Sequence, residues 1–154
     1  MSLNLQKKLK VKPGSFDKII MMNSWLTLSN RQENLKLLMD YVRKWAGEHS
    51  LPPNRQQSLE KAAEEIFHHL VNHAYRHDQP GSIAVSLEEK GPRLRLTFED
   101  DAAPHNASSL SGLPAPDNPD PASCILYNGL QQLAESVVYY RTADRKNRMV
   151  IFLT

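Results

Sequence analysis

The sequence has little of what an oxidising compartment, a membrane or a nucleic-acid partner would require. Its 154 residues include one cysteine, Cys124, which cannot form a disulfide bond within the chain. No apolar run approaches the roughly 20 residues of a membrane-spanning helix, and the opening segment lacks the apolar stretch of a signal peptide. The formal net charge of +2 is too small to indicate nucleic acid. We therefore expect a cytoplasmic protein that binds neither membranes nor nucleic acid directly.

One long segment lacks both basic residues and structural periodicity. No lysine or arginine occurs between Arg95 and Arg141, and residues 101–123 contain five prolines with almost no apolar pattern. We predict a long loop over residues 101–123, and loops of that length inside a domain are usually functional.

Hydrophobic patterns predict one domain over residues 19–154, preceded by a basic arm over residues 1–18. The expected elements are a strand at 19–28, helices near 35–46 and 53–77, a hairpin with strands near 83–87 and 94–98, a third helix near 125–134, and closing strands at 136–142 and 148–154. Because the helices cluster instead of alternating with single strands, we predict an α+β two-layer sandwich. Its sheet is expected to be mixed but mainly antiparallel, with about three helices on one face.

The second predicted helix carries the most chemistry, in the stretch EEIFHHLVNHAY from Glu64 to Tyr75. At 100° per residue, the side chains of Glu65, His69, Asn72 and Arg76 form a stripe about 60° wide along one margin of the apolar face. A carboxylate and an amide one turn apart suit a hydrated Mg²⁺, which prefers oxygen ligands. The alternative is a solvated polar stripe with i,i+4 pairing.

From Trp25 to Thr154 the sequence resembles the anti-sigma factor serine/threonine kinases, a regulatory branch of the GHKL ATPases. The similar segments are LTLSNRQENLKLLMDYVRKWA, LPPNRQQSLEKAAEEIFHHLVNHAY, RLRLTFEDDAAP and SVVYYRTADRKNRMVIFLT. The most specific feature is the pair EE followed by HAY. Family members commonly carry Arg-His-Ala-Tyr at this second position, and in this sequence Asn72 replaces the arginine. The resemblance implies the histidine kinase-like ATPase (Bergerat) fold, with residues 101–123 as an altered ATP lid. It also implies ATP and Mg²⁺ as cofactors, a sigma factor or an anti-sigma antagonist as partner, and a homodimer.

The resemblance assigns roles to individual residues. Glu65 matches the family's catalytic glutamate, and His69 stands where the family has an asparagine that binds Mg²⁺. Asp100 matches the aspartate that accepts the adenine amino proton, and Ala102 replaces the glycine that follows it. The Gly-x-Gly that cradles phosphate has no counterpart in PASCILYNG. The candidate cofactor-binding residues are therefore His69, Asn72, His73, Asp100 and Ala102, with His69 at the metal-ligand position.

Two functions are compatible with this pattern. The first is an anti-sigma-like regulatory protein with impaired nucleotide binding, which acts by protein–protein recognition in transcriptional or stress signalling. The alternative is an active serine/threonine kinase that uses Glu65 and Asp100 to phosphorylate an anti-sigma antagonist. The absence of basic residues and glycine hinges from the lid favours the first, because these groups usually clamp phosphates.

A third hypothesis is a transition-metal site. Glu65, His69 and His73 are spaced four residues apart and approach one another on successive helical turns. Three ligands on one straight helix cannot surround an ion tetrahedrally. His105 in the predicted loop is a candidate for the closing ligand.

Overall fold

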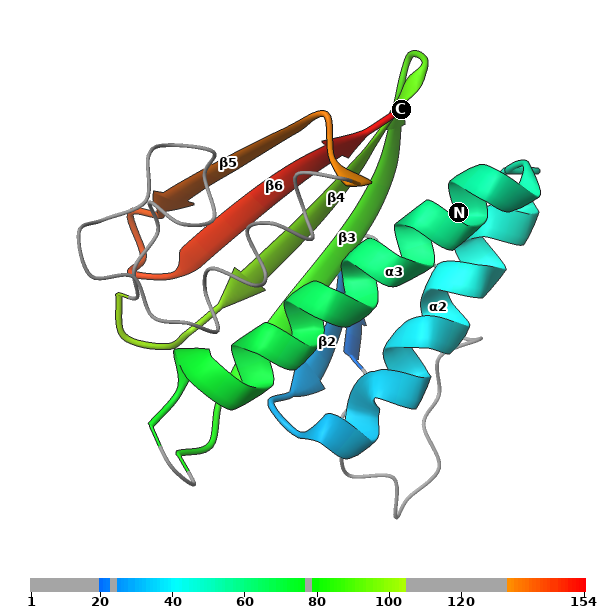
Figure 1. Cartoon of the computed structure of the whole chain (residues 1–154). Coiled ribbons are helices and arrows are strands. Elements are labelled where there is room, and N and C mark those ends of the chain that lie inside the picture. The colour runs from blue at the N-terminus through cyan, green and yellow to red at the C-terminus, as the bar shows by residue number, and fades with distance from the viewer. Residues whose placement is uncertain (1–19, 23–24, 77–78, 105–132) are drawn as a thin grey trace.

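The computed structural model of the chain describes residues 20–22, 25–76, 79–104 and 133–154. They form an α+β fold in which two long helices lie side by side on one face of a sheet (Figure 1). The elements are β1 (Ile20–Met22), β2 (Trp25–Ser29), the 3₁₀ helix η1 (Gln32–Asn34), α2 (Leu35–Glu48), α3 (Pro53–His69), the π-helix η2 (Leu70–Ala74), β3 (Ser82–Lys90), β4 (Arg93–Asp100), β5 (Ser136–Arg141) and β6 (Asn147–Leu153). The predicted sandwich is confirmed.

The sheet has the strand order β1-β2-β3-β4-β6-β5. Every pairing between the described strands is antiparallel. This agrees with the mainly antiparallel sheet that we predicted, and the described strands include no parallel pair. The β3–β4 hairpin turns at Gly91 and Pro92, with φ of 61° at the glycine. A positive φ followed by the negative φ of proline is the sign pattern of a type II′ turn, whose twist suits a hairpin.

The core lies between the sheet and the two helices. Residues Leu94, Leu96 and Phe98 of β4 alternate toward the helices, as the sequence predicted for this strand. The predicted apolar face of the second helix is confirmed, because its five members are all buried: Leu59, Ala62, Ala63 and Ile66 of α3 and Leu70 at the start of η2. Pro53 occupies the first turn of α3, where a missing backbone N–H removes no helical hydrogen bond.

The predicted end of the second helix at His77 is wrong. The α-helix ends at His69, continues as π-helix to Ala74, and gives way to extended backbone at Tyr75, where φ is −107° and ψ is 150°. The cause is a tertiary contact that periodicity does not show: the Tyr75 hydroxyl binds Asp101 and the carbonyl of Ser82.

Several predictions fall on parts of the chain outside the described residues. These are the basic arm over residues 1–18, the lid from residue 105 onward, and most of the third helix near 125–134. Within the described ranges, no helix is both long and apolar enough to cross a bilayer.

Candidate functional site

One part of the predicted site surrounds Asp100, the last residue of β4. Its side chain is buried, with 3% of the residue exposed. Asp100 Oδ1 accepts hydrogen bonds from the Ala102 backbone N–H at 3.0 Å and from Asn147 Nδ2 at 2.8 Å. Asp100 and Asn147 are register partners in the β4–β6 ladder, so the sheet itself places the two side chains together.

Asn147 also organises the backbone that follows Asp100. Its Nδ2 lies 3.1 Å from the Ala102 carbonyl and 3.2 Å from the Ala103 carbonyl. Arg141 at the end of β5 donates from Nη1 to Asn147 Oδ1 at 2.8 Å and approaches the Ala102 carbonyl at 3.4 Å. Side chains from β5 and β6 therefore hydrogen-bond to the backbone at the start of the predicted lid.

Sequence reasoning missed Asn147 and Arg141. A usable signal was present for Asn147, because this polar residue is in phase with the buried Met149 and Ile151 of the same strand. A polar side chain on the buried side of a strand needs hydrogen-bond partners, which points to a network. Arg141 gave no comparable signal.

Ala102, where the resemblance leads us to expect glycine, has no backbone strain from a positive φ. Among the described residues, positive φ occurs at Ser50, Gly91 and Arg145, so Ala102 does not adopt the conformation that would require glycine. Its methyl group is buried in the hydrophobic core. The replacement of glycine by alanine therefore leaves the turn after Asp100 intact.

Glu65 and His69 lie near the end of α3. Glu65 is half-buried, and its Oε2 is buried with no hydrogen-bond partner among the described residues. An unpaired buried oxygen is costly, so this atom is suited to a donor from a ligand or from another segment. His69 is 6% exposed, and its ring lies 5.1 Å from the ring of the exposed His73, measured between centroids.

Asn72 does not extend the stripe as the sequence predicted. Its Nδ2 lies 3.0 Å from His68 Nε2 and donates to the His68 carbonyl at 2.9 Å, and His68 Nδ1 contacts Gln32 at 3.2 Å. The 100° spacing fails because Asn72 lies in the π-helix η2, which has more residues per turn than an α-helix. The amide therefore binds His68, the histidine that the sequence placed away from the stripe.

The three-ligand metal hypothesis finds no support in the described part of the chain. There, no three histidine, cysteine or acidic side chains gather into a group that could hold a metal ion. Glu65, His69 and His73 therefore form no such group by themselves. His105 lies outside the described residues.

Tyr75, from the HAY signature, joins the end of the helix to the sheet. Its hydroxyl is 2.8 Å from Asp101 Oδ1 and 3.0 Å from the Ser82 carbonyl, and the Ser82 N–H donates to the same Asp101 oxygen at 2.9 Å. Burial, together with the hydrogen bond to Asp101, raises the pKa of Tyr75 far above its usual value. Gly81 packs directly against this ring. Sequence reasoning missed Asp101.

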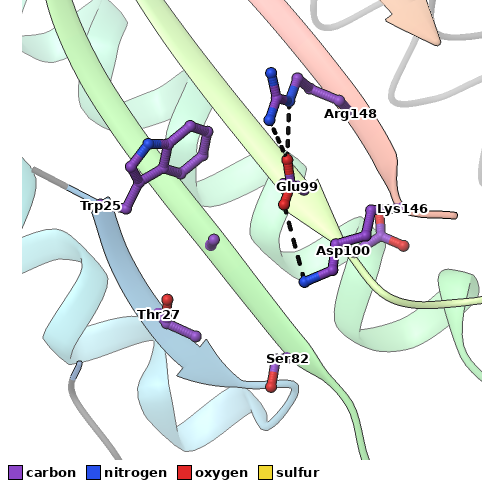
Figure 2. Close-up of a pocket in the computed structure, with 8 residues that line it drawn as sticks. Trp25, Thr27, Ser82, Glu99, Asp100, Lys146 and Arg148 are labelled. Atoms are coloured by element: carbon purple, nitrogen blue, oxygen red, sulfur yellow. Dashed lines mark hydrogen bonds and ion pairs between the residues drawn. The ribbon is translucent and has the colours of Figure 1, made fainter. Parts of the chain in front are cut away.

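A hollow of about 310 Å³ lies on the face of the sheet opposite the helices (Figure 2). In its wall, Arg148 Nε donates to Glu99 at 2.9 Å, which raises the pKa of the arginine. The same guanidinium lies 5.5 Å from the centre of the Trp25 ring, and Lys146 is 4.0 Å from Glu99. Asp100 borders the hollow, and the other predicted site residues do not line it. The hollow therefore shares only Asp100 with the predicted nucleotide site.

Comparison with known families identifies the class of protein that this fold defines. A family model of the histidine kinase-like ATPase domain matches residues 28–151, which is most of the chain. The chain therefore belongs to the histidine kinase-like ATPase domain family. A search of curated proteins gives no significant match. The matched span includes both long helices, the strands β3, β4 and β5, and most of β6.

The residues present are suited unequally to the two cofactors that the resemblance implies, ATP and Mg²⁺. A carboxylate held by two donors, as in Asp100, is a suitable acceptor for the amino group of adenine. By contrast, His69 offers a buried imidazole where Mg²⁺ would need an oxygen ligand. Asp100 is therefore chemically suited to accept an amino proton, whereas His69 is not suited to bind Mg²⁺.

Proposed function

We propose that this protein is a cytoplasmic regulator of the anti-sigma type that works by recognising other proteins and does not transfer phosphate. Its partner is a sigma factor or an anti-sigma antagonist, and it acts as a homodimer. In this proposal the nucleotide site keeps its adenine-binding end and has lost its Mg²⁺ end.

The observation that carries the proposal is the contrast between Asp100 and His69. The aspartate sits in a buried network with a fixed orientation, whereas His69 is buried and packs against His73 at the position of the family's Mg²⁺ ligand. Phosphoryl transfer depends on positioning and on neutralising charge, and a metal bridging the phosphates supplies much of both. A fold that keeps only the adenine end can bind a nucleotide without transferring its phosphate.

The active kinase is a second candidate function, and one observation favours it. Glu65 keeps a buried carboxylate oxygen with no partner among the described residues, which is the state expected of a group reserved for a ligand. Against it stands the absence of lysine and arginine between Arg95 and Arg141, because phosphate sites usually contain basic groups.

Calorimetric titration with ATP and ADP, each with and without Mg²⁺, separates the two candidates. We expect weak binding that Mg²⁺ does not strengthen, because His69 offers no oxygen ligand. Tight binding that requires Mg²⁺, together with transfer of ³²P from ATP to an antagonist protein, would instead establish the kinase.

The change His69→Asn is expected to create a dependence on Mg²⁺. Because it restores an oxygen ligand, ATP affinity in the presence of Mg²⁺ should rise about tenfold, which equals about 1.4 kcal/mol. The matched control is His68→Asn, since His68 is an exposed neighbour bonded to Gln32 and Asn72. An equal response of the two variants to Mg²⁺ would show that His69 does not occupy the ligand position.

Partner recognition needs its own measurement. Purified protein is mixed with each sigma factor and each antagonist-type protein of the same genome, and complexes are scored by size-exclusion chromatography with light scattering. We expect a dimer alone and a stoichiometric complex with one of these proteins. Failure to form a complex with any of them would refute the proposed role.

A further inference from the structure

We propose that Asn147 is a positioning residue that orients the Asp100 carboxylate for adenine, and that Arg141 fixes the orientation of the Asn147 amide. This inference rests on the adenine recognition in the proposed function. It assigns to β5 and β6, which lie far along the sequence from Asp100, a part in selecting the base.

The surroundings of Asn147 determine which way its amide faces. One side of the amide meets three acceptors, namely Asp100 Oδ1 and the carbonyls of Ala102 and Ala103, at 2.8 to 3.2 Å. The other side meets a donor, Nη1 of Arg141, at 2.8 Å. The reversed amide would place its oxygen against three acceptors and its NH₂ against a cation, so a single orientation is compatible with the network.

The fixed amide in turn fixes the carboxylate. Asn147 Nδ2 and the Ala102 N–H both donate to the same oxygen, Oδ1 of Asp100, from different directions. Two donors on one oxygen set the plane of the carboxylate and therefore the direction of its other oxygen. Asn147 is only 1% exposed, so water does not compete for these hydrogen bonds.

The chemistry of the bases provides a test that separates positioning from mere structural support. Adenine presents an amino donor where guanine presents a carbonyl acceptor. A correctly oriented carboxylate therefore favours ATP over GTP, and a misoriented carboxylate loses that preference. General loosening of the fold weakens binding of both nucleotides equally.

The experiment measures ATP and GTP affinities without Mg²⁺ for the wild type, Asn147→Ala and Arg141→Met. We expect the ATP:GTP affinity ratio to fall about tenfold in Asn147→Ala, which equals about 1.4 kcal/mol, and by a smaller factor in Arg141→Met. The matched control is Asn34→Ala, because Asn34 is a buried asparagine whose amide donates to Ser29. An unchanged ratio in a folded Asn147→Ala protein would overturn the inference.

A second measurement does not depend on nucleotide binding. Amide hydrogen exchange at Ala102 reports whether its N–H stays bonded to Asp100, and we expect exchange to become at least about tenfold faster in Asn147→Ala. Arg141 is exposed, so Arg141→Met provides a folded variant if Asn147→Ala is unstable. A wild type that binds neither nucleotide refutes the proposed adenine recognition and, with it, the role toward adenine. Unchanged exchange in both variants refutes the positioning of Asp100 separately.

Discussion

Replacing Gly81 by alanine is expected to destabilise the protein by about 3 kcal/mol or more. A Cβ atom at this position would lie 2.0 Å from Cε1 of Tyr75, 2.6 Å from its Cζ and 2.8 Å from Oδ1 of Asp101. The ring cannot swing away cheaply, because its hydroxyl is held by Asp101 and by the Ser82 carbonyl. Either the ring or the start of β3 must move, and the hydrogen bonds there are lost. Urea unfolding measures the change.

The matched control for Gly81→Ala is Gly47→Ala. Gly47 lies in α2, and a Cβ there meets no atom within 4 Å, so alanine should stabilise the helix by about 0.5 to 1 kcal/mol. The double variant Tyr75→Ala/Gly81→Ala tests the cause, because without the ring the second substitution should cost little. Additive losses in that cycle would show that the ring does not explain the effect.

The close packing of Gly81 and Tyr75 illustrates what the sequence could and could not predict. Local patterns were sufficient for the β3–β4 hairpin, the closing strands, the two long helices and the buried apolar face of the second helix, because alternation and helical spacing reflect burial directly. The single strand expected at 19–28 was wrong, because this segment forms two strands, β1 and β2, that pair antiparallel with each other. Local patterns also failed at the end of the helix, where the hydroxyl of Tyr75 is held by Asp101, 26 residues further along the chain. Such a long-range contact overrides the local helix propensity, and local sequence patterns do not predict it.

The residues of the candidate site likewise include some that the sequence predicted and others that only the structure revealed. Family motifs pointed to Asp100, which the structure places in a buried network, but the residues of that network are supplied by β5 and β6 through strand register. The stripe prediction failed for Asn72 because a π-helix interrupts the regular spacing. Positions within one regular element are thus predictable, whereas partners set by register or by helix defects require the structure.

Alkaline pH is expected to lower the stability of this protein more steeply than ionisation of exposed tyrosines would. Burial raises the pKa of Tyr41 to about 12, and burial with the Asp101 hydrogen bond raises the pKa of Tyr75 further. Between pH 10 and pH 12 the unfolded chain has lost these phenolic protons while the folded chain keeps them. Unfolding therefore releases protons, and the free energy of unfolding falls by up to about 1.4 kcal/mol per pH unit for each tyrosine.

Chemical denaturation at several pH values between 9 and 12 tests this expectation, with the slope of stability against pH as the measured quantity. Tyr75→Phe loses its hydrogen bonds and is less stable at every pH, so its absolute stability does not test the expectation. The test is the slope of its free energy of unfolding against pH, because removal of one phenol should reduce the loss per pH unit by up to about 1.4 kcal/mol. Tyr41→Phe should do the same below pH 12, and the double variant should retain neither contribution. Equal slopes in the wild type and the double variant would mean that neither phenol holds its proton through folding, which would contradict the burial of Tyr75 against Asp101 and Gly81.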